Sequence, residues 1–414
     1  MSSVDPKIDF FSVVGDDVSP EAVSFLSQSL AAEWSMVDLS PSGVCDLRKE
    51  NSQVAFPGCQ RIVSECNVRV EEDIINGINV QWVIPENHPA ERHRTNQRQE
   101  VIVFYLYGGG FVCGCPEDDL SITSRLATHL SLRVCVPRYR LSPEHHYPAA
   151  ISDVTRVYLS VSKIFNVLLV GESAGGNLAL SLLLSAMSSP LKKLDEEQNI
   201  NAEREDERNA SVASDHDKKD LFRVPLAVAL LSPWIDLTHS GQSHRQLQLD
   251  PTLSVKHFLD PAAQAYSGAY SPNHGGISPL FADFPPPSSL WPPTTISTGT
   301  RDLLRSDAVR LASKIKTGFL ADELESSNDI KLDGGQRNND TNADTMSVFQ
   351  NPKKDLNFVK EAECASDKAK SGSPIVDVRV AKEMWHVYEW SPEIPEAEVS
   401  LRYISEFLLK YSDL

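Results

Sequence analysis

A serine between glycines, set between an apolar run and a helix-forming segment, constrains this chain more than any other feature. The run NVLLV at residues 166–170 leads directly into Gly171-Glu172-Ser173-Ala174-Gly175. A G-x-S-x-G motif in that context holds its serine on a strained turn between a strand and a helix, with the hydroxyl exposed near the positive helix end. Small residues on both sides let the neighbouring backbone approach closely. The pattern predicts an α/β fold with Ser173 as a nucleophile.

Apolar runs of strand length alternate with helix-like segments from about residue 65 onward. Strands are expected at 79–84, 101–106, 133–136, 167–170, 225–231, 294–297 and 376–380, and helices at 174–187, 307–316 and 396–411. Several of these runs are almost wholly apolar, as in strands that are buried on both faces. The alternation predicts a mostly parallel central sheet flanked by helices.

A further helix is expected near the N-terminus. Ser19 can cap it, Pro20 suits its first position, and four apolar residues then recur at helical spacing. These residues are Val23, Leu26, Leu30 and Trp34. Such a helix could pack on the main domain or cover the active site as a lid.

Two polar segments interrupt the alternation, at residues 192–220 and 322–373. They cannot bury enough apolar surface to offset the entropy of ordering, so they are expected to be disordered surface inserts.

Composition excludes several classes of function. The net charge of −18 argues against binding nucleic acid or anionic lipid through a broad basic surface. The apolar runs are too short to span a bilayer, and the opening residues lack the pattern of a signal peptide. Seven cysteines without regular spacing fit reduced thiols, and no histidine cluster accompanies Cys113 and Cys115. A cytoplasmic protein without a metal site is expected.

A glycine run follows the expected strand at 101–106, in Tyr107-Gly108-Gly109-Gly110-Phe111. Glycines directly after a strand leave backbone N–H groups unshielded, so that several of them can point at one forming oxyanion. The simpler interpretation is a flexible glycine turn. The position of the run ahead of the serine motif favours an oxyanion hole.

An acid and a base are needed to activate a serine, and in this fold they follow it in the order acid, then histidine. Asp302 and His386 each come directly after an expected strand. Asp307 is an alternative acid, but it falls at the start of the next helix, where a carboxylate commonly serves the helix dipole. The other candidate bases all precede Asp302: His145, His146, His216, His239, His244, His257 and His274. Without the insert at 322–373, about thirty residues separate the acid from His386, which suits one crossover unit.

With these motifs the sequence resembles the hormone-sensitive-lipase-like branch of the α/β-hydrolases, of carboxylesterase and acetylhydrolase type. The likeness extends over residues 101–410, less the two inserts. It is carried by GESAGGN at 171–177, YRLSPE at 139–144 followed by YPAA at 147–150, LSPW at 231–234 with Asp236, ISPL at 277–280 and TGTRDLLRSDAVRLASKI at 298–315.

The resemblance implies hydrolysis of carboxylic esters through an acyl-enzyme, without cofactor or metal. It implies a catalytic triad of Ser173, Asp302 and His386, and oxyanion donors at the N–H groups of Gly108, Gly109 and Ala174. It also implies an N-terminal cap, which divides the chain into a cap segment at 1–60 and a catalytic domain at 61–414.

Tyr107 stands where the family usually has histidine, whose side chain helps to fix the glycine loop. The tyrosine hydroxyl could replace those hydrogen bonds, or the loop could be shifted. Arg140 and Glu144 are expected to brace loops beneath the site.

The expected substrate is a small or medium hydrophobic ester, an acetyl ester or lactone included. Phe111, Trp234 and Trp385 are candidate pocket walls, although aromatic residues beside a motif are as often core residues. The alternatives are a non-catalytic small-molecule receptor, as in the plant gibberellin receptors that resemble this branch, and an acyltransferase. The oligomeric state is left open, a dimer included.

Overall fold

The computed structural model describes residues 11–14, 18–29, 35–86, 99–188, 222–246, 250, 252–286, 290–318, 320 and 373–412. Apart from residue 373, the two expected inserts lie outside the described residues, and so do Leu30 and Trp34 of the expected N-terminal helix.

A mostly parallel sheet forms the centre of the molecule. Its strand order is β1-β9-β8-β7-β6-β4-β5-β3-β2. The strands are β1 (Phe11–Val14), β2 (Val68–Ile75), β3 (Ile78–Pro85), β4 (Val101–Leu106), β5 (Val134–Pro137), β6 (Asn166–Glu172), β7 (Ala227–Leu231), β8 (Thr294–Gly299) and β9 (Val376–Ala381). Only the pairings of β3 with β2 and with β5 are antiparallel among these strands. All seven expected strands are present, and the predicted α/β sheet is confirmed.

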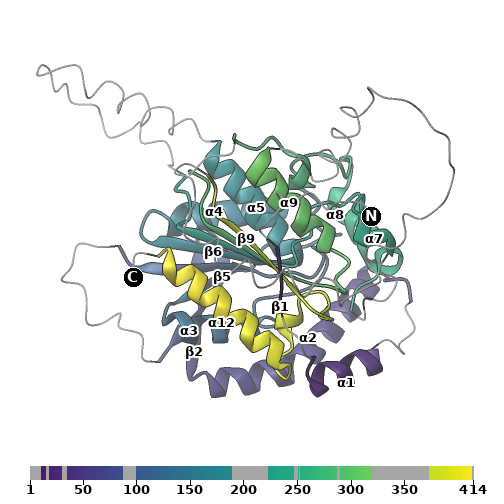
Figure 1. Ribbon diagram of the computed structural model, residues 1–414, viewed down its shortest axis with the longest axis horizontal. Helices are drawn as coiled ribbons and strands as arrows, with labels where there is room; N and C mark the ends of the chain where they lie inside the picture. Colours follow the sequence, from purple (N-terminus) through teal and green to yellow (C-terminus); the bar gives the residue numbers. More distant parts are fainter. Residues whose placement is uncertain are drawn as a thin grey trace, which may run out of the picture.

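Helices cover both faces of the sheet (Figure 1). α3 (Leu120–Leu130) and α12 (Pro395–Lys410) lie on one face, and α2 (Pro41–Glu65) packs against α3. α4 (Ala149–Val161), α5 (Ser173–Met187) and α9 (Arg305–Thr317) lie on the other face. This coverage explains why β4, β7 and β8 are buried at every position.

Short helices connect the larger elements. They are α7 (Gln242–Gln246), the π-helical turn η2 (Val255–Leu259), α8 (Asp260–Ser267), and the 3₁₀ turns η3 (Pro279–Phe281) and η5 (Tyr388–Trp390).

The N-terminal helix α1 (Pro20–Ser29) begins where it was expected. The Ser19 hydroxyl accepts a hydrogen bond from the Ala22 amide at 3.1 Å, as a helix cap does. The predicted apolar stripe is wrong at Val23, which is 54% exposed. Ala22 and Leu26 are buried instead, and Phe25 between them stacks on Trp385 at a ring-centroid distance of 4.3 Å. α1 therefore packs on the loop that carries His386.

The expected boundary between residues 60 and 61 falls inside α2, which runs without a break from Pro41 to Glu65. A cap segment that ends at residue 60 would divide this helix, so the N-terminal helical segment ends at the close of α2. Ser40 caps the start of α2 by accepting from the amide of Gly43 at 3.2 Å.

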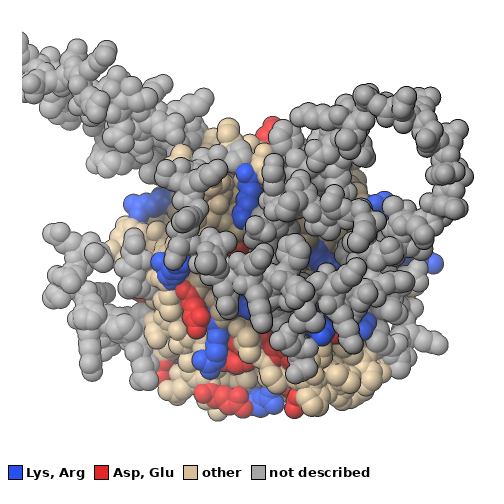
Figure 2. All heavy atoms as spheres, in the orientation of Figure 1, with Lys and Arg blue, Asp and Glu red and all other residues tan. Residues whose placement is uncertain are grey.

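Acidic and basic side chains are interspersed over the described surface on the face seen in Figure 2. Within the described ranges, no helix combines the length and the apolar character that crossing a membrane requires.

Candidate active site

Ser173 occupies the turn between β6 and α5, with a backbone φ of +51°. A non-glycine residue in this left-handed region is strained, and such strain concentrates at functional sites. The turn is tight enough that a Cβ atom on Gly175 would lie 2.0 Å from the Leu106 carbonyl oxygen. This contact explains the small residue on the helix side of the motif. The serine is 5% exposed.

The structure brings His386 and Asp302 to this serine from distant parts of the chain. His386 Nε2 lies 2.9 Å from Ser173 Oγ, and His386 Nδ1 lies 3.2 Å from Asp302 Oδ1. With the proton on Nδ1, the imidazole donates to the carboxylate and can accept the serine proton at Nε2. Of the three residues that the chain order selected, His386 is therefore within hydrogen-bonding reach of both Ser173 and Asp302.

Asp302 lies beyond the end of β8 and is completely buried. Its carboxylate accepts hydrogen bonds from Thr298 Oγ1 at 2.8 Å and from the Leu304 amide at 2.9 Å. Burial raises the pKa of Asp302, but the charge and hydrogen bonds of its neighbours, His386 foremost, outweigh burial, so that the pKa is lowered overall. Asp302 is therefore the ionised partner of the imidazole.

His386 is held in the loop after β9. Its neighbour Val387 has a φ of +45° and donates its amide to Ser232 Oγ at 3.1 Å. Burial lowers the pKa of His386, but the charge and hydrogen bond of Asp302, with a smaller contribution from Asp250, outweigh burial and raise it. The imidazolium that forms on accepting a proton is thus stabilised.

Asp250 is a second buried carboxyl group at the site that the sequence did not reveal. Its Oδ2 accepts from the Leu303 amide at 3.2 Å, and its Oδ1 accepts from the amide and hydroxyl of Thr252. Burial, together with the charge of Asp302, raises its pKa to about 6. No motif surrounds Asp250, so the sequence offered no signal for it.

In the glycine loop, the structure contradicts one of the predicted oxyanion donors, Gly108. The Gly108 amide donates to the Glu172 carboxyl group, so it is not free for an oxyanion. The amides of Gly109 and Ala174 have no acceptor among the described residues. Gly109 has a φ of +95°, and a Cβ atom there would lie 2.3 Å from the Cys113 carbonyl oxygen, so only glycine fits this turn.

Tyr107 forms a reciprocal pair of hydrogen bonds with Tyr139. The Tyr139 hydroxyl donates to the Tyr107 carbonyl oxygen at 2.6 Å, and the Tyr107 hydroxyl donates to the Tyr139 carbonyl oxygen at 3.3 Å. The two rings stack with centroids 4.2 Å apart, and both are almost completely buried. The strand end that carries the glycine loop is thus tied to the loop after β5.

Arg140 and Glu144 brace neighbouring segments, as expected. Arg140 makes a two-pronged ion pair with the buried Asp153 of α4, at 2.7 and 2.8 Å. Glu144 pairs with Arg48 of α2, whose guanidinium also donates to the Val112 carbonyl oxygen just after the glycine loop.

The three candidate pocket aromatics are core residues in this structure. Phe111, Trp234 and Trp385 are each 1% exposed or less, so none of them presents side-chain surface to a substrate. Phe111 stacks on Tyr266 of α8. Their positions beside the motifs made them candidates, and the structure favours the alternative interpretation that they belong to the core.

A family model described as "alpha/beta hydrolase fold" matches residues 103–324. The chain belongs to this family. The match includes the glycine loop, the serine motif and Asp302.

Relatives of this α/β hydrolase include an "Esterase" from Acinetobacter venetianus, 26% identical over 51% of this chain and 60% of the relative. An "Acetyl-hydrolase" from Streptomyces hygroscopicus is 26% identical over 53% of this chain and 63% of the relative. The chain thus spans about 60% of the length of these curated relatives. "Carboxylesterase 20" from Arabidopsis thaliana is 32% identical over 30% of this chain and 43% of the relative.

Solved structures agree on the fold. A crystal structure of EstE5 soaked with p-nitrophenyl butyrate superimposes with a TM-score of 0.63 at 20% identity, and the match covers 96% of this chain and all of that one. An esterase of the bacterial hormone-sensitive lipase family gives a TM-score of 0.57 at 20% identity, over 95% of this chain and 99% of that one.

The alternative acid of this α/β hydrolase, Asp307, has a different position. It is completely buried and accepts from the amides of Ile235 and Asp236, both at 3.0 Å. His244 lies 3.3 Å from its other oxygen. Asp307 therefore supports the loop after β7 and not the base at residue 386.

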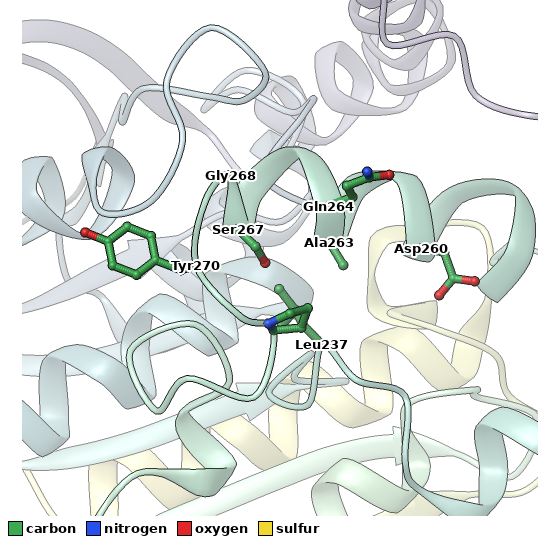
Figure 3. A pocket seen from close by; sticks show the side chains of 8 residues that line it. Leu237, Asp260, Ala263, Gln264, Ser267, Gly268 and Tyr270 are labelled. Atoms are coloured by element: carbon green, nitrogen blue, oxygen red, sulfur yellow. The ribbon is translucent and has the colours of Figure 1, made fainter.

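A hollow lies beside α8 (Figure 3), and Ser173 is not among the residues that line it. It measures about 290 Å³ and is lined by Leu237, Asp260, Ala263, Gln264, Ser267, Gly268, Tyr270 and Pro272. The inner side of α8 instead contacts the glycine loop, where a Cβ atom on Gly110 would lie 3.4 Å from Ala262. The hollow therefore lies across the helix from the glycine loop.

Proposed function

We propose that this chain is a serine carboxylesterase that hydrolyses a small or medium hydrophobic ester. Ser173 is the nucleophile, His386 is the general base and Asp302 orients that base. The observation that carries the proposal is a single imidazole within 3.2 Å of both a strained serine hydroxyl and a buried carboxylate.

In the acylation step, Ser173 Oγ attacks the ester carbonyl carbon while its proton moves to His386 Nε2. The amides of Gly109 and Ala174 donate to the oxyanion that forms, and a single donor of this kind is worth about 2.7–4 kcal/mol of transition-state stabilisation. The tetrahedral intermediate then expels the alcohol, which takes the proton from His386 and leaves an acyl group on Ser173.

Deacylation follows the same path with water in place of the serine. A water molecule gives its proton to His386 Nε2 and adds to the acyl carbon, and the collapse of the second intermediate releases the acid. Ser173 Oγ recovers the proton. The buried Asp302 carboxylate stabilises the imidazolium in both halves of the cycle.

The names of the relatives support an ester as the substrate, since they are called esterase, acetyl-hydrolase and carboxylesterase. The low exposure of Ser173, 5%, favours a small acyl group. We further propose that the N-terminal helices cap the site, because Phe25 of α1 contacts the residue next to His386.

A panel of p-nitrophenyl esters of increasing acyl length tests this proposal with three proteins. These are the wild type, Ser173→Ala, and Ser185→Ala, which removes an exposed serine of the same helix as a matched control. We expect wild-type turnover from the control and none above background from Ser173→Ala. Equal turnover by all three proteins would refute the nucleophile, and tight binding of an ester without turnover would favour a receptor. Transfer of the acyl group to an added alcohol in preference to water would favour an acyltransferase.

A further inference from the structure

Two short loops at the carboxyl ends of neighbouring strands carry the acid and the base. Asp302 follows β8, which ends at Gly299, and His386 follows β9, which ends at Ala381. The two strands are parallel, and Gly299 is paired with Ala381 where their register ends. The position of the acid relative to the base therefore depends on the contacts between these two loops.

Backbone contacts join the two loops just beyond the strands. The Thr300 amide donates to the Ala381 carbonyl oxygen and the Arg301 amide to the Met384 carbonyl oxygen, both at 2.9 Å. A Cβ atom on Gly299 would lie 1.9 Å from the same Met384 oxygen, so only glycine permits this close approach. These contacts involve no side chain, and they hold the beginning of the acid loop against the turn after β9.

The hydroxyl group of Thr300 adds a side-chain bond to the same turn. Thr300 Oγ1 accepts from the Glu383 amide at 2.7 Å. Glu383 has a φ of +59°, a strained value for a residue other than glycine, and its amide has no other acceptor among the described residues. The Thr300 carbonyl oxygen is itself held by the Arg305 guanidinium. The hydroxyl thus ties a strained turn to a residue that is fixed on its other side.

An ion pair also bridges the two loops, between Arg301 and Glu383. The guanidinium donates to Glu383 Oε2 at 2.8 and 2.5 Å, and the two side chains are 27% and 39% exposed. Ion pairs between partly exposed side chains contribute little, because water screens them and two long side chains must be ordered. The Thr300 hydroxyl sits on a short side chain and binds the backbone itself, so it restrains the path of the chain more directly.

The hydrogen bond between the acid and the base is sensitive to the spacing of the loops. Its length of 3.2 Å, from His386 Nδ1 to Asp302 Oδ1, is at the long end of the normal range. Only Met384 and Trp385 lie between Glu383 and His386, and both are buried. A movement of the turn at Glu383 would therefore be passed on to the imidazole and would weaken this bond.

We propose that Thr300 is a positioning residue, whose hydroxyl fixes the loop of Asp302 against the loop of His386 and so keeps the imidazole aligned with its acid. The effect on turnover rests on the proposed function. The alignment of the imidazole does not, and it can be measured without a substrate.

Three variants separate this role from a general contribution to stability. Thr300→Val removes the acceptor and keeps the shape, and Thr300→Ser keeps the hydroxyl. Thr295→Val is the matched control, because the Thr295 hydroxyl also bridges the two strands by donating to Asp377 Oδ2 at 3.1 Å. That bond lies at the other end of the strands, which begin at Thr294 and Val376. Urea unfolding compares the stabilities, and circular dichroism establishes that each variant is folded.

The first test is proton NMR of the imidazole without substrate. A proton on His386 Nδ1 that is bonded to a carboxylate resonates far downfield, and the signal is assigned by its absence in His386→Gln. We expect Thr300→Val to move this signal upfield or to lose it through exchange with water, and Thr300→Ser and Thr295→Val to keep it. An unchanged signal in Thr300→Val would overturn the proposal. A signal that moves in a protein without esterase activity would support the positioning role and contradict only the proposed function.

The second test measures kcat and KM for an ester. Displacing a catalytic group by about 1 Å can cost about 10²-fold, so Thr300→Val should lower kcat by about 10- to 100-fold at an unchanged KM. Thr300→Ser and Thr295→Val should keep the wild-type kcat. An equal loss in Thr300→Val and Thr295→Val would overturn the proposal, because it would show a general effect of bonds between the strands. Failure of Thr300→Ser to restore kcat would overturn it as well, because the hydroxyl would then not be the group that acts.

Discussion

The tyrosine pair that ties down the glycine loop allows a quantitative prediction. Its two hydrogen bonds differ in length, 2.6 Å from the Tyr139 hydroxyl and 3.3 Å from the Tyr107 hydroxyl. Both rings are at most 2% exposed, so water cannot replace either bond. Tyr139→Phe removes the short bond and leaves the Tyr107 carbonyl oxygen unpaired, which costs about 1–3 kcal/mol.

Tyr107→Phe is the matched comparison, because it keeps the stacked rings and removes only the long bond. A bond near the distance limit contributes little, so we expect a loss at or below the lower end of the typical net value of about 0.5–1.5 kcal/mol. Urea unfolding followed by circular dichroism measures both losses, and the slope against urea concentration should not change. Tyr139→Phe should also lower kcat more than Tyr107→Phe, since the Tyr107 carbonyl oxygen adjoins the loop.

The reasoning would be refuted if Tyr107→Phe were the more destabilising change, or if Tyr139→Phe left the free energy of unfolding unaltered. Either result would mean that the hydroxyl bonds do not hold the strand end in place.

Three further predictions concern the site itself. Asp302→Asn should lower kcat by about 10⁴-fold in ester assays, because the imidazole loses its orienting acceptor. Since the pKa of His386 is raised, the rise of kcat/KM with pH should be centred above 6.5, and Asp250→Asn should move it to lower pH by removing a negative charge. The pH–rate profiles of the two proteins measure that shift. An unchanged profile would show that Asp250 does not raise the pKa of His386. Gly109→Ala should lower kcat by about 10²–10³-fold by displacing one donor, whereas Gly77→Ala, at a similarly positive φ far from the serine in the chain, should leave kcat unchanged.

The sequence predicted the central sheet well for a physical reason. Strands covered on both faces are mostly apolar, so β4, β6 and β7 are visible as nearly continuous apolar runs. β2 was not predicted, because most of its residues are exposed and its sequence VRVEEDII is rich in charge. Only pairing with β3 defines it as a strand.

The candidate site likewise has residues that the sequence predicted and contacts that it could not predict. Ser173, Asp302 and His386 each follow a strand, and parallel strands bring their carboxyl ends to one edge of the sheet, so chain order was sufficient to select them. The capture of the Gly108 amide by Glu172 depends on the contact of two loops, which no local pattern encodes. Asp250 likewise reaches the site only through the tertiary fold.

Covalent labelling tests the central claim most directly. A p-nitrophenyl phosphonate ester reacts with an activated serine, releases p-nitrophenol and remains attached to the oxygen. Peptide mapping by mass spectrometry should find one adduct per chain, on the peptide that contains Ser173, and no adduct in Ser173→Ala. Labelling at another residue, or an unlabelled wild type that still hydrolyses esters, would contradict the account.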